Sequence, residues 1–107
     1  GVSGRPTPTP TPETYTVTVR NGTTVARLAS KYATVVEDSF ANVTIVGREN
    51  AENQTYAETF LVNVSGKDAG ATLLSKTLDI PIKPMPASEP SASSDFVIIV
   101  GKDKADL

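Results

Sequence analysis

The sequence contains no cysteine, no histidine and no tryptophan, and only 6% of its 107 residues are aromatic. Without cysteine, the chain forms no disulfide bond, has no thiol nucleophile and builds no cysteine-based zinc site. Without histidine, it also lacks the commonest metal ligand and the side chain that most often acts as a base near neutral pH. These absences favour a non-catalytic module over an enzyme, and they predict neither a metal site nor a cofactor.

Charge of one sign is also scarce, because 10 Lys and Arg residues nearly balance 12 Asp and Glu residues, for a net charge of -2. No basic cluster follows the spacing of a phosphate backbone, so nucleic acid is not expected as a partner. No apolar run reaches the length of about 18–20 residues that a transmembrane helix needs. The chain opens on Gly1 rather than Met, so any export signal or membrane anchor is expected upstream in a longer parent.

Proline is concentrated at the start of the chain, where Pro6, Pro8, Pro10 and Pro12 alternate with threonines. Each proline fixes its own φ and biases the residue before it, so this stretch favours extended polyproline II. We predict a linker over residues 1–13, one folded domain over residues 14–104 and a tail over residues 105–107. The alternative is that the Pro/Thr segment is a peptide ligand.

Tyr15 to Arg20 alternates apolar and polar residues and predicts a strand with one buried face. Asn21 and Gly22 tolerate positive φ and end that strand, and Thr23 or Thr24 is expected to cap the helix that follows. The helix is predicted from an apolar stripe with helical spacing. Its members are Val25, Leu28, Ala29, Tyr32 and Val36.

Val43 and Ile45 alternate in a second predicted strand, which stops at Gly47. The polar segment Arg48 to Glu58 is predicted to be a loop. A third strand is predicted over Phe60 to Val64, where apolar residues again alternate.

A second helix is predicted from Asp68 to Leu78, followed by a Pro/Ser-rich connection and a fully apolar strand, Phe96 to Val100. The order strand, helix, strand, strand, helix, strand predicts an α+β two-layer sandwich of the ferredoxin-like kind. Its sheet order would be fourth, first, third, second, all antiparallel, with both helices on one face. The unbroken apolar run of the last strand favours an alternative, an α/β fold with a mixed or parallel sheet and the last strand central.

A candidate binding site is predicted at the turn after the first strand, where free amides at a helix N-terminus could hold an anion. The same residues also suit a turn for backbone reasons alone. An aspartate before the last strand joins this turn only if the first and last strands are antiparallel. A tyrosine in the polar loop could stack on a sugar. The candidate residues are Asn21, Gly22, Thr23, Thr24, Asp95 and Tyr56.

Two segments resemble the LytR C-terminal domain family. VTVRNGTTVARLASKYA, Val17 to Ala33, is similar to that family's opening strand, Asn-Gly-Thr turn and helix, and SDFVIIVGKD, Ser94 to Asp103, is similar to its closing strand. Val100 stands where the family usually has Leu, and Asp79 stands where it has Gly. The matching motif positions are Asn21, Gly22, Thr23, Asp95, Gly101 and Asp103.

This resemblance implies an accessory domain of a Gram-positive or actinobacterial cell-envelope protein, either membrane-anchored or secreted. Such domains lie downstream of LytR-CpsA-Psr catalytic domains or alone behind an anchor, outside the cytoplasm. The arginine-rich active site of those catalytic domains has no counterpart here, so the resemblance implies no enzyme activity.

Two functions are therefore expected for a monomeric module. The first is contact with cell-wall glycan or wall polymer. The second is docking on, or spacing of, the parent's catalytic domain, for example by strand addition at an exposed edge such as Val43 to Val46.

Overall fold

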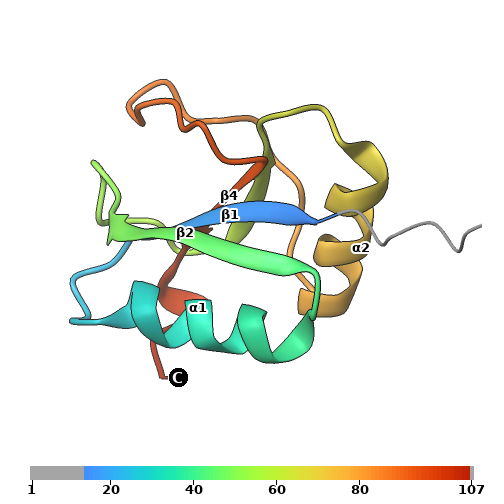
Figure 1. Cartoon of the computed structure of the whole chain (residues 1–107). Helices are drawn as coiled ribbons and strands as arrows, with labels where there is room; N and C mark the ends of the chain where they lie inside the picture. The colour runs from blue at the N-terminus through green and yellow to red at the C-terminus, as the bar shows by residue number, and fades with distance from the viewer. Residues whose placement is uncertain (1–13, 107) are drawn as a thin grey trace, which may run out of the picture.

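The computed structural model describes residues 14–106 and shows an α+β fold, as the sequence predicts (Figure 1). The predicted linker, residues 1–13, lies outside the described residues. Two helices and four strands follow one another in the predicted order, and a short 3-10 helix comes last. The elements are β1 (Tyr15–Asn21), α1 (Leu28–Ser39), β2 (Val43–Asn50), β3 (Phe60–Asn63), α2 (Asp68–Leu78), β4 (Phe96–Val100) and η1 (Lys102–Lys104).

The four strands form one mixed sheet in the order β2-β1-β4-β3. β1 is parallel to both β2 and β4, and β3 is antiparallel to β4. The antiparallel ferredoxin-like order is therefore wrong, and the alternative of a mixed sheet with the last strand central is confirmed. The physical reason lies in β4, whose five residues are all buried, because central strands with both faces covered are continuously apolar.

Both helices pack against the same face of the sheet, which we call the helix face. The core on this face contains alternate residues of the strands, such as Val17, Val19 and Ile98, together with the apolar stripes of the two helices. The buried helix residues are Leu28, Ala29, Tyr32, Ala33 and Val36 of α1, and Gly70, Ala71, Leu74 and Leu78 of α2.

The opposite face is covered by irregular chain, residues 83–94, which we call the strap. Figure 1 shows the strap on one side of the sheet and α1 on the other. Under the strap lies a smaller apolar cluster, in which Val97 and Ile99 of β4 are fully buried. The strap begins along β3, because the Leu61 N–H donates to the Pro81 carbonyl (2.9 Å) and the Lys83 N–H donates to the Leu61 carbonyl (2.9 Å). We call this second surface the strap face.

The start of α1 differs from the prediction. The helix begins at Leu28, and its N-cap residue is Arg27, in the left-handed region at φ 64°, with no side-chain capping bond. Thr23 and Thr24 therefore do not cap the helix. Val25 is not helical either, although it packs half-buried against the core of the helix face. The apolar spacing predicted the buried stripe from Leu28 onward, but the six residues from Gly22 to Arg27 separate that stripe from β1.

β2 is longer than predicted, because it continues through Gly47 to Asn50. The pairing with β1 shifts register at this point, so that Ile45 is opposite Val17 and Gly47 is opposite Thr18. Val46 is thus the extra residue of a β-bulge, and glycine marks the bulge rather than the end of the strand. The first three residues of the predicted polar loop therefore belong to a strand.

β3 is one residue shorter than predicted, since Val64 lies outside it. The N–H groups of Val64 and Ser65 both donate to the Asp95 carbonyl (3.0 and 3.1 Å). This pair of bonds to one acceptor turns the chain away from the ladder.

Candidate functional site at the carboxyl edge of the sheet

The predicted site residues divide between two ends of the sheet. Asn21 ends β1, and Gly22 to Thr24 follow it, at the edge where the parallel strands β1 and β2 end. Tyr56 joins this group, because its N–H donates to the Gly22 carbonyl (3.1 Å). Asp95 does not join it: β4 is parallel to β1, so Asp95 lies at the other end of the sheet beside Thr16.

The Asn21 side chain stabilises the turn through hydrogen bonds from both its oxygen and its nitrogen. Its Oδ1 accepts hydrogen bonds from the Thr23 N–H (2.9 Å) and hydroxyl (2.7 Å), and its Nδ2 donates to the Val25 carbonyl (2.6 Å). The Thr23 hydroxyl also accepts from the Val25 N–H (3.1 Å). Both side chains are buried. They stabilise the turn, and only Thr24 of the predicted Asn21 to Thr24 group is exposed.

Gly22 is required by close packing. A Cβ at this position would lie 2.6 Å from the Tyr56 ring and 2.8 Å from the Val100 carbonyl oxygen, distances that real Cβ atoms do not tolerate. The Gly22 N–H also donates to that carbonyl (2.8 Å). The Tyr56 ring therefore lies against the turn, and it makes a T-shaped contact with Phe60 at 5.6 Å between ring centroids.

Asp95 ties the start of β4 to the start of β1. Its carboxylate accepts from the Thr16 N–H (3.0 Å), while its own N–H donates to the Thr16 hydroxyl (2.9 Å). The bond from the Thr16 N–H, followed by the nearby Lys67 ammonium, holds the pKa of the Asp95 carboxyl below its ordinary value despite partial burial. These two bonds to Thr16 give Asp95 a structural role in the motif that requires no ligand.

The closing motif residues Gly101 and Asp103 form a second clamp around Thr59. The Asp103 carboxylate accepts from the Thr59 N–H (3.0 Å) and hydroxyl (2.6 Å), and that hydroxyl accepts from the Gly101 N–H (2.9 Å). A Cβ on Gly101 would lie 2.6–2.7 Å from the backbone of Glu58. These motif residues thus form turns and clamps, and a solvent-accessible surface lies beside them.

That surface is a polar hollow at the carboxyl edge of β1 and β2, which we call the edge hollow. In open α/β sheets, ligands bind in the crevice outside the carboxyl ends of the parallel strands, and the edge hollow lies at the corresponding end of β1 and β2. The hollow has two adjoining parts with volumes of about 360 and 180 Å³, which share Asn21, Arg27 and Asn50. Its exposed polar lining comes from Thr24, Arg27, Ser30, Arg48, Glu49, Asn50 and, partly buried, Gln54.

The edge hollow presents mainly hydrogen-bond donors. Arg27 is exposed, and the first turn of α1 carries no acidic residue. Arg48 forms an exposed ion pair with Glu37 (3.1 Å) and keeps 40% of its side chain accessible. Guanidinium and amide groups of this kind bind hydroxyl, carboxylate and phosphate groups.

Sequence reasoning missed Arg27, Arg48, Asn50 and Gln54. The available signal was the length of β2: a strand continued to Asn50 pairs with Asn21 in register and brings the two amides to one edge. The glycine at position 47 concealed that continuation.

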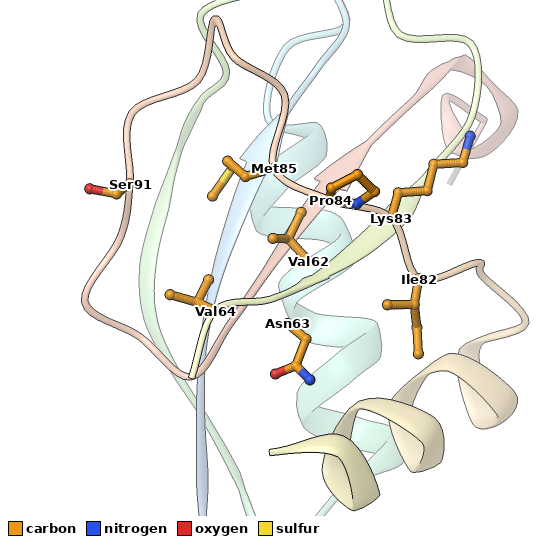
Figure 2. Close-up of a pocket in the computed structure, with 8 residues that line it drawn as sticks. All are labelled: Val62, Asn63, Val64, Ile82, Lys83, Pro84, Met85 and Ser91. Carbon is orange, nitrogen blue, oxygen red and sulfur yellow. The ribbon is translucent and has the colours of Figure 1, made fainter. Parts of the chain in front are cut away.

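A second depression, which we call the β3 groove, lies between β3 and the strap and has a volume of about 550 Å³ (Figure 2). It is mainly apolar, and none of the predicted site residues lines it. Val64 (37% exposed) and Ile82 (46% exposed) are among its apolar walls. The lining residues are Val62, Asn63, Val64, Ile82, Lys83, Pro84, Met85 and Ser91.

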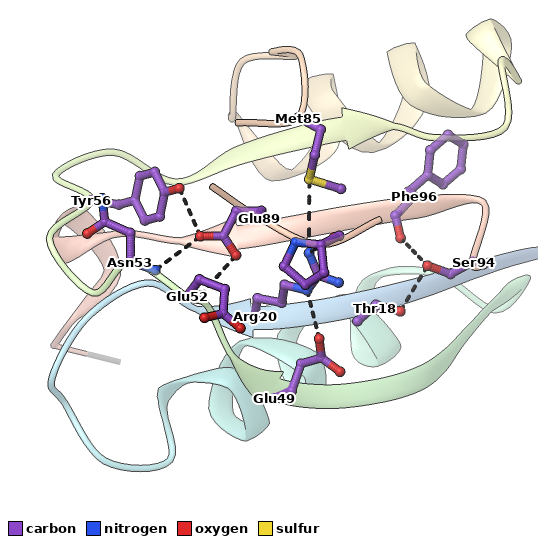
Figure 3. A network of polar contacts seen from close by, with 11 residues as sticks. Thr18, Arg20, Glu49, Glu52, Asn53, Tyr56, Met85, Glu89, Ser94 and Phe96 are labelled. Carbon is purple, nitrogen blue, oxygen red and sulfur yellow. Dashed lines mark hydrogen bonds and ion pairs between the residues drawn. The ribbon is translucent and has the colours of Figure 1, made fainter. Parts of the chain in front are cut away.

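Two buried charged side chains secure the strap (Figure 3). Arg20, 3% exposed, donates through Nε to Glu49 (2.7 Å) and through a terminal nitrogen to the Pro90 carbonyl (2.7 Å). Glu89, 7% exposed, accepts from the N–H groups of Glu52 (3.0 Å) and Asn53 (3.1 Å). The strap is thus bonded at adjacent residues to β1 and to the loop after β2.

Within residues 14–106, no helix is both long and apolar enough to cross a membrane. Neither the curated proteins nor the solved structures compared with the chain include a match. A sequence model of one family, described as LytR cell envelope-related transcriptional attenuator, matches residues 14–103. The match includes every strand and both α-helices of the fold, so the chain belongs to this family and is a cell-envelope-associated accessory domain.

Proposed function

We propose that the domain is a non-catalytic, extracytoplasmic module that contacts cell-wall glycan or wall polymer through the edge hollow. The observation that carries this proposal is the group of exposed guanidinium, amide and hydroxyl groups where the parallel strands end. Wall glycans present many hydroxyl groups and anionic substituents, which accept hydrogen bonds from such donors. Membership of a cell-envelope family supports the location.

The test is an amide chemical-shift titration of the labelled domain with soluble peptidoglycan and wall-polymer fragments. We expect saturable shifts at Thr24, Arg27, Asn50 and Gln54, which line the hollow.

A double variant, Arg27→Gln with Arg48→Gln, should weaken binding about tenfold or more, equivalent to about 1.4 kcal/mol or more. The matched control is Lys76→Gln, which removes an exposed cation from α2. The control should bind like the unmodified domain.

Shifts that are absent at millimolar ligand, or that are unchanged in the double variant, would refute contact through this hollow. The second candidate function, docking on a catalytic domain of the parent protein, would then be tested by adding that domain to the same labelled sample. β2 is an edge strand with Val46 exposed, as strand addition requires, but its bulge opposes regular pairing there.

A further inference from the structure

The carboxylate of Glu89 occupies a site made of neutral donors in the loop after β2. One oxygen accepts from the Glu52 N–H (3.0 Å), and the other accepts from the Asn53 N–H (3.1 Å) and the Tyr56 hydroxyl (3.1 Å). Figure 3 shows the Glu89 carboxylate between these groups. Successive backbone N–H groups that point to one anion form an anion-binding concavity, which we call the nest.

Among the described residues, no cation forms an ion pair with Glu89, although the residue is almost fully buried. The neighbouring cation, Arg20, instead directs its guanidinium to Glu49 and to the Pro90 carbonyl. The nest alone therefore compensates the buried charge. Burial and the adjacent carboxylate raise the pKa of the Tyr56 hydroxyl, so its proton remains available to donate to an anion.

Glu89 belongs to the strap, which has no helix or strand of its own and carries Pro84, Pro86 and Pro90. The loop that forms the nest is fixed independently of the strap. Tyr56 is bonded to Gly22, and the Lys102 N–H donates to the Tyr56 carbonyl (3.0 Å). The nest should therefore persist when Glu89 leaves it.

We propose that Glu52, Asn53 and Tyr56 form a carboxylate-binding site that Glu89 occupies as an internal ligand, and that a carboxylate-bearing saccharide takes its place; the choice of a saccharide rests on the proposed function. The bidentate use of both Glu89 oxygens selects a planar carboxylate. The site is distinct from the edge hollow, because the Glu52 and Asn53 amides face the strap whereas Gln54 lines the hollow. Chemical shifts at Glu52 and Asn53 therefore test this proposal, whereas shifts at Thr24, Arg27, Asn50 and Gln54 test the edge hollow.

The first experiment empties the nest. In the Glu89→Ala variant, acetate should shift the amides of Glu52 and Asn53 in a saturable manner, with an affinity at least about tenfold higher than in the unmodified domain. Sodium chloride at equal ionic strength should not reproduce these shifts. Glu89→Gln, which retains the side-chain volume, should block acetate binding because its amide fills the space.

An Ala variant that folds and does not respond to acetate would overturn the nest. If the Ala variant does not fold, Glu89→Asp is used in its place. The affinity of Glu89→Asp for acetate is then compared with that of the unmodified domain. The shorter Asp carboxylate reaches the donors poorly, so Glu89→Asp should bind acetate more tightly. Equal affinities would overturn the proposal.

The second experiment tests displacement in the unmodified domain, with glucuronate as probe and glucose as its neutral match. Glucuronate should shift Glu52 and Asn53 and, in parallel, the strap residues Ser91 and Ala92, whereas glucose should not. If the Ala variant binds acetate but glucuronate leaves the unmodified domain unchanged, Glu89 is a permanent clamp and displacement is refuted.

Discussion

The two faces of the sheet are covered in different ways. The helix face packs against two amphipathic helices and buries a continuous apolar core. The strap face is covered by irregular chain, with a smaller apolar cluster and buried polar groups. Helices satisfy their own backbone groups, whereas an irregular strap needs partners for its backbone and obtains them from Arg20 and from β3. The strap therefore covers its face of the sheet incompletely and leaves the β3 groove beside it. We expect the strap face to open more readily than the helix face.

Two neighbouring isoleucines of β4 measure this difference directly. Ile98 packs against the helices, Ile99 packs under the strap, and both are fully buried. Ile98→Ala should cost about 3–5 kcal/mol of unfolding free energy, and Ile99→Ala about 2–3 kcal/mol, because a strap relaxes into a cavity more easily than two packed helices do. Urea denaturation of both variants provides the values. Equal costs would show that the strap is as rigid as the helices.

Tyr32 and Tyr56 extend the comparison to alkaline pH. Burial, with a smaller contribution from Asp103, raises the pKa of Tyr32 on the helix face to about 12, and its hydroxyl has no partner among the described residues. In the unfolded chain the Tyr32 phenol has a pKa near 10, so above that pH it ionises more readily in the unfolded state and stabilises that state. The contribution of Tyr32 to the free energy of unfolding is therefore fully present below about pH 10 and decreases by about 2–3 kcal/mol as the pH rises to about 12.

The Tyr32→Phe variant should lose most of this alkaline sensitivity while remaining about equally stable at pH 7, since it removes an unpaired hydroxyl. Tyr56→Phe, on the half-exposed strap side, should change the alkaline profile less. Denaturation midpoints measured from pH 8 to pH 12 test both variants. An unchanged slope in Tyr32→Phe would assign the alkaline loss to other groups.

Arg20 provides a test of the strap alone. Arg20→Met should cost about 2 kcal/mol, because the Pro90 carbonyl loses its charged donor and Glu49 loses its ion-pair partner. Hydrogen exchange should accelerate at strap amides such as Glu89 and Lys83 more than at α1. Arg20→Lys retains the charge without the planar guanidinium, so its stability should lie between that of the unmodified domain and that of Arg20→Met. Uniform acceleration across both faces would mean that the strap does not open separately.

Periodicity predicted the helix face well. α2 and β4 have the predicted bounds, since a helical stripe of apolar residues reports one buried face and an unbroken apolar run reports burial on both faces. The strap face was not predictable in this way, because its cover has no period and its anchors are one arginine and one glutamate among several charged residues. A buried carboxylate held by two backbone amides and one distant hydroxyl leaves no sequence signal that distinguishes Glu89 from an exposed glutamate.

Part of the candidate site was predictable from local sequence. Local patterns singled out the Asn21 to Thr24 turn and Tyr56, and the structure places this turn at the carboxyl edge of the sheet with Tyr56 beside it. Their role in binding stays a prediction. Asp95 depended on the direction of β4 relative to β1, a long-range property that local patterns do not encode.

Asp95 gives the smallest expected effect and tests whether the end of the sheet opposite the hollow contributes to both faces. Its folded-state pKa is below the unfolded value, chiefly because of the Thr16 N–H, so its stabilisation is present above about pH 4 and is lost as the pH falls further. Asp95→Asn should therefore cost about 1 kcal/mol or less at pH 7 and almost nothing at pH 2. Because Asp95 joins the starts of β1 and β4, on which both covers pack, hydrogen exchange should increase equally at α1 amides and at strap amides such as Lys83. A change confined to one of these two groups of amides would place Asp95 with that face alone.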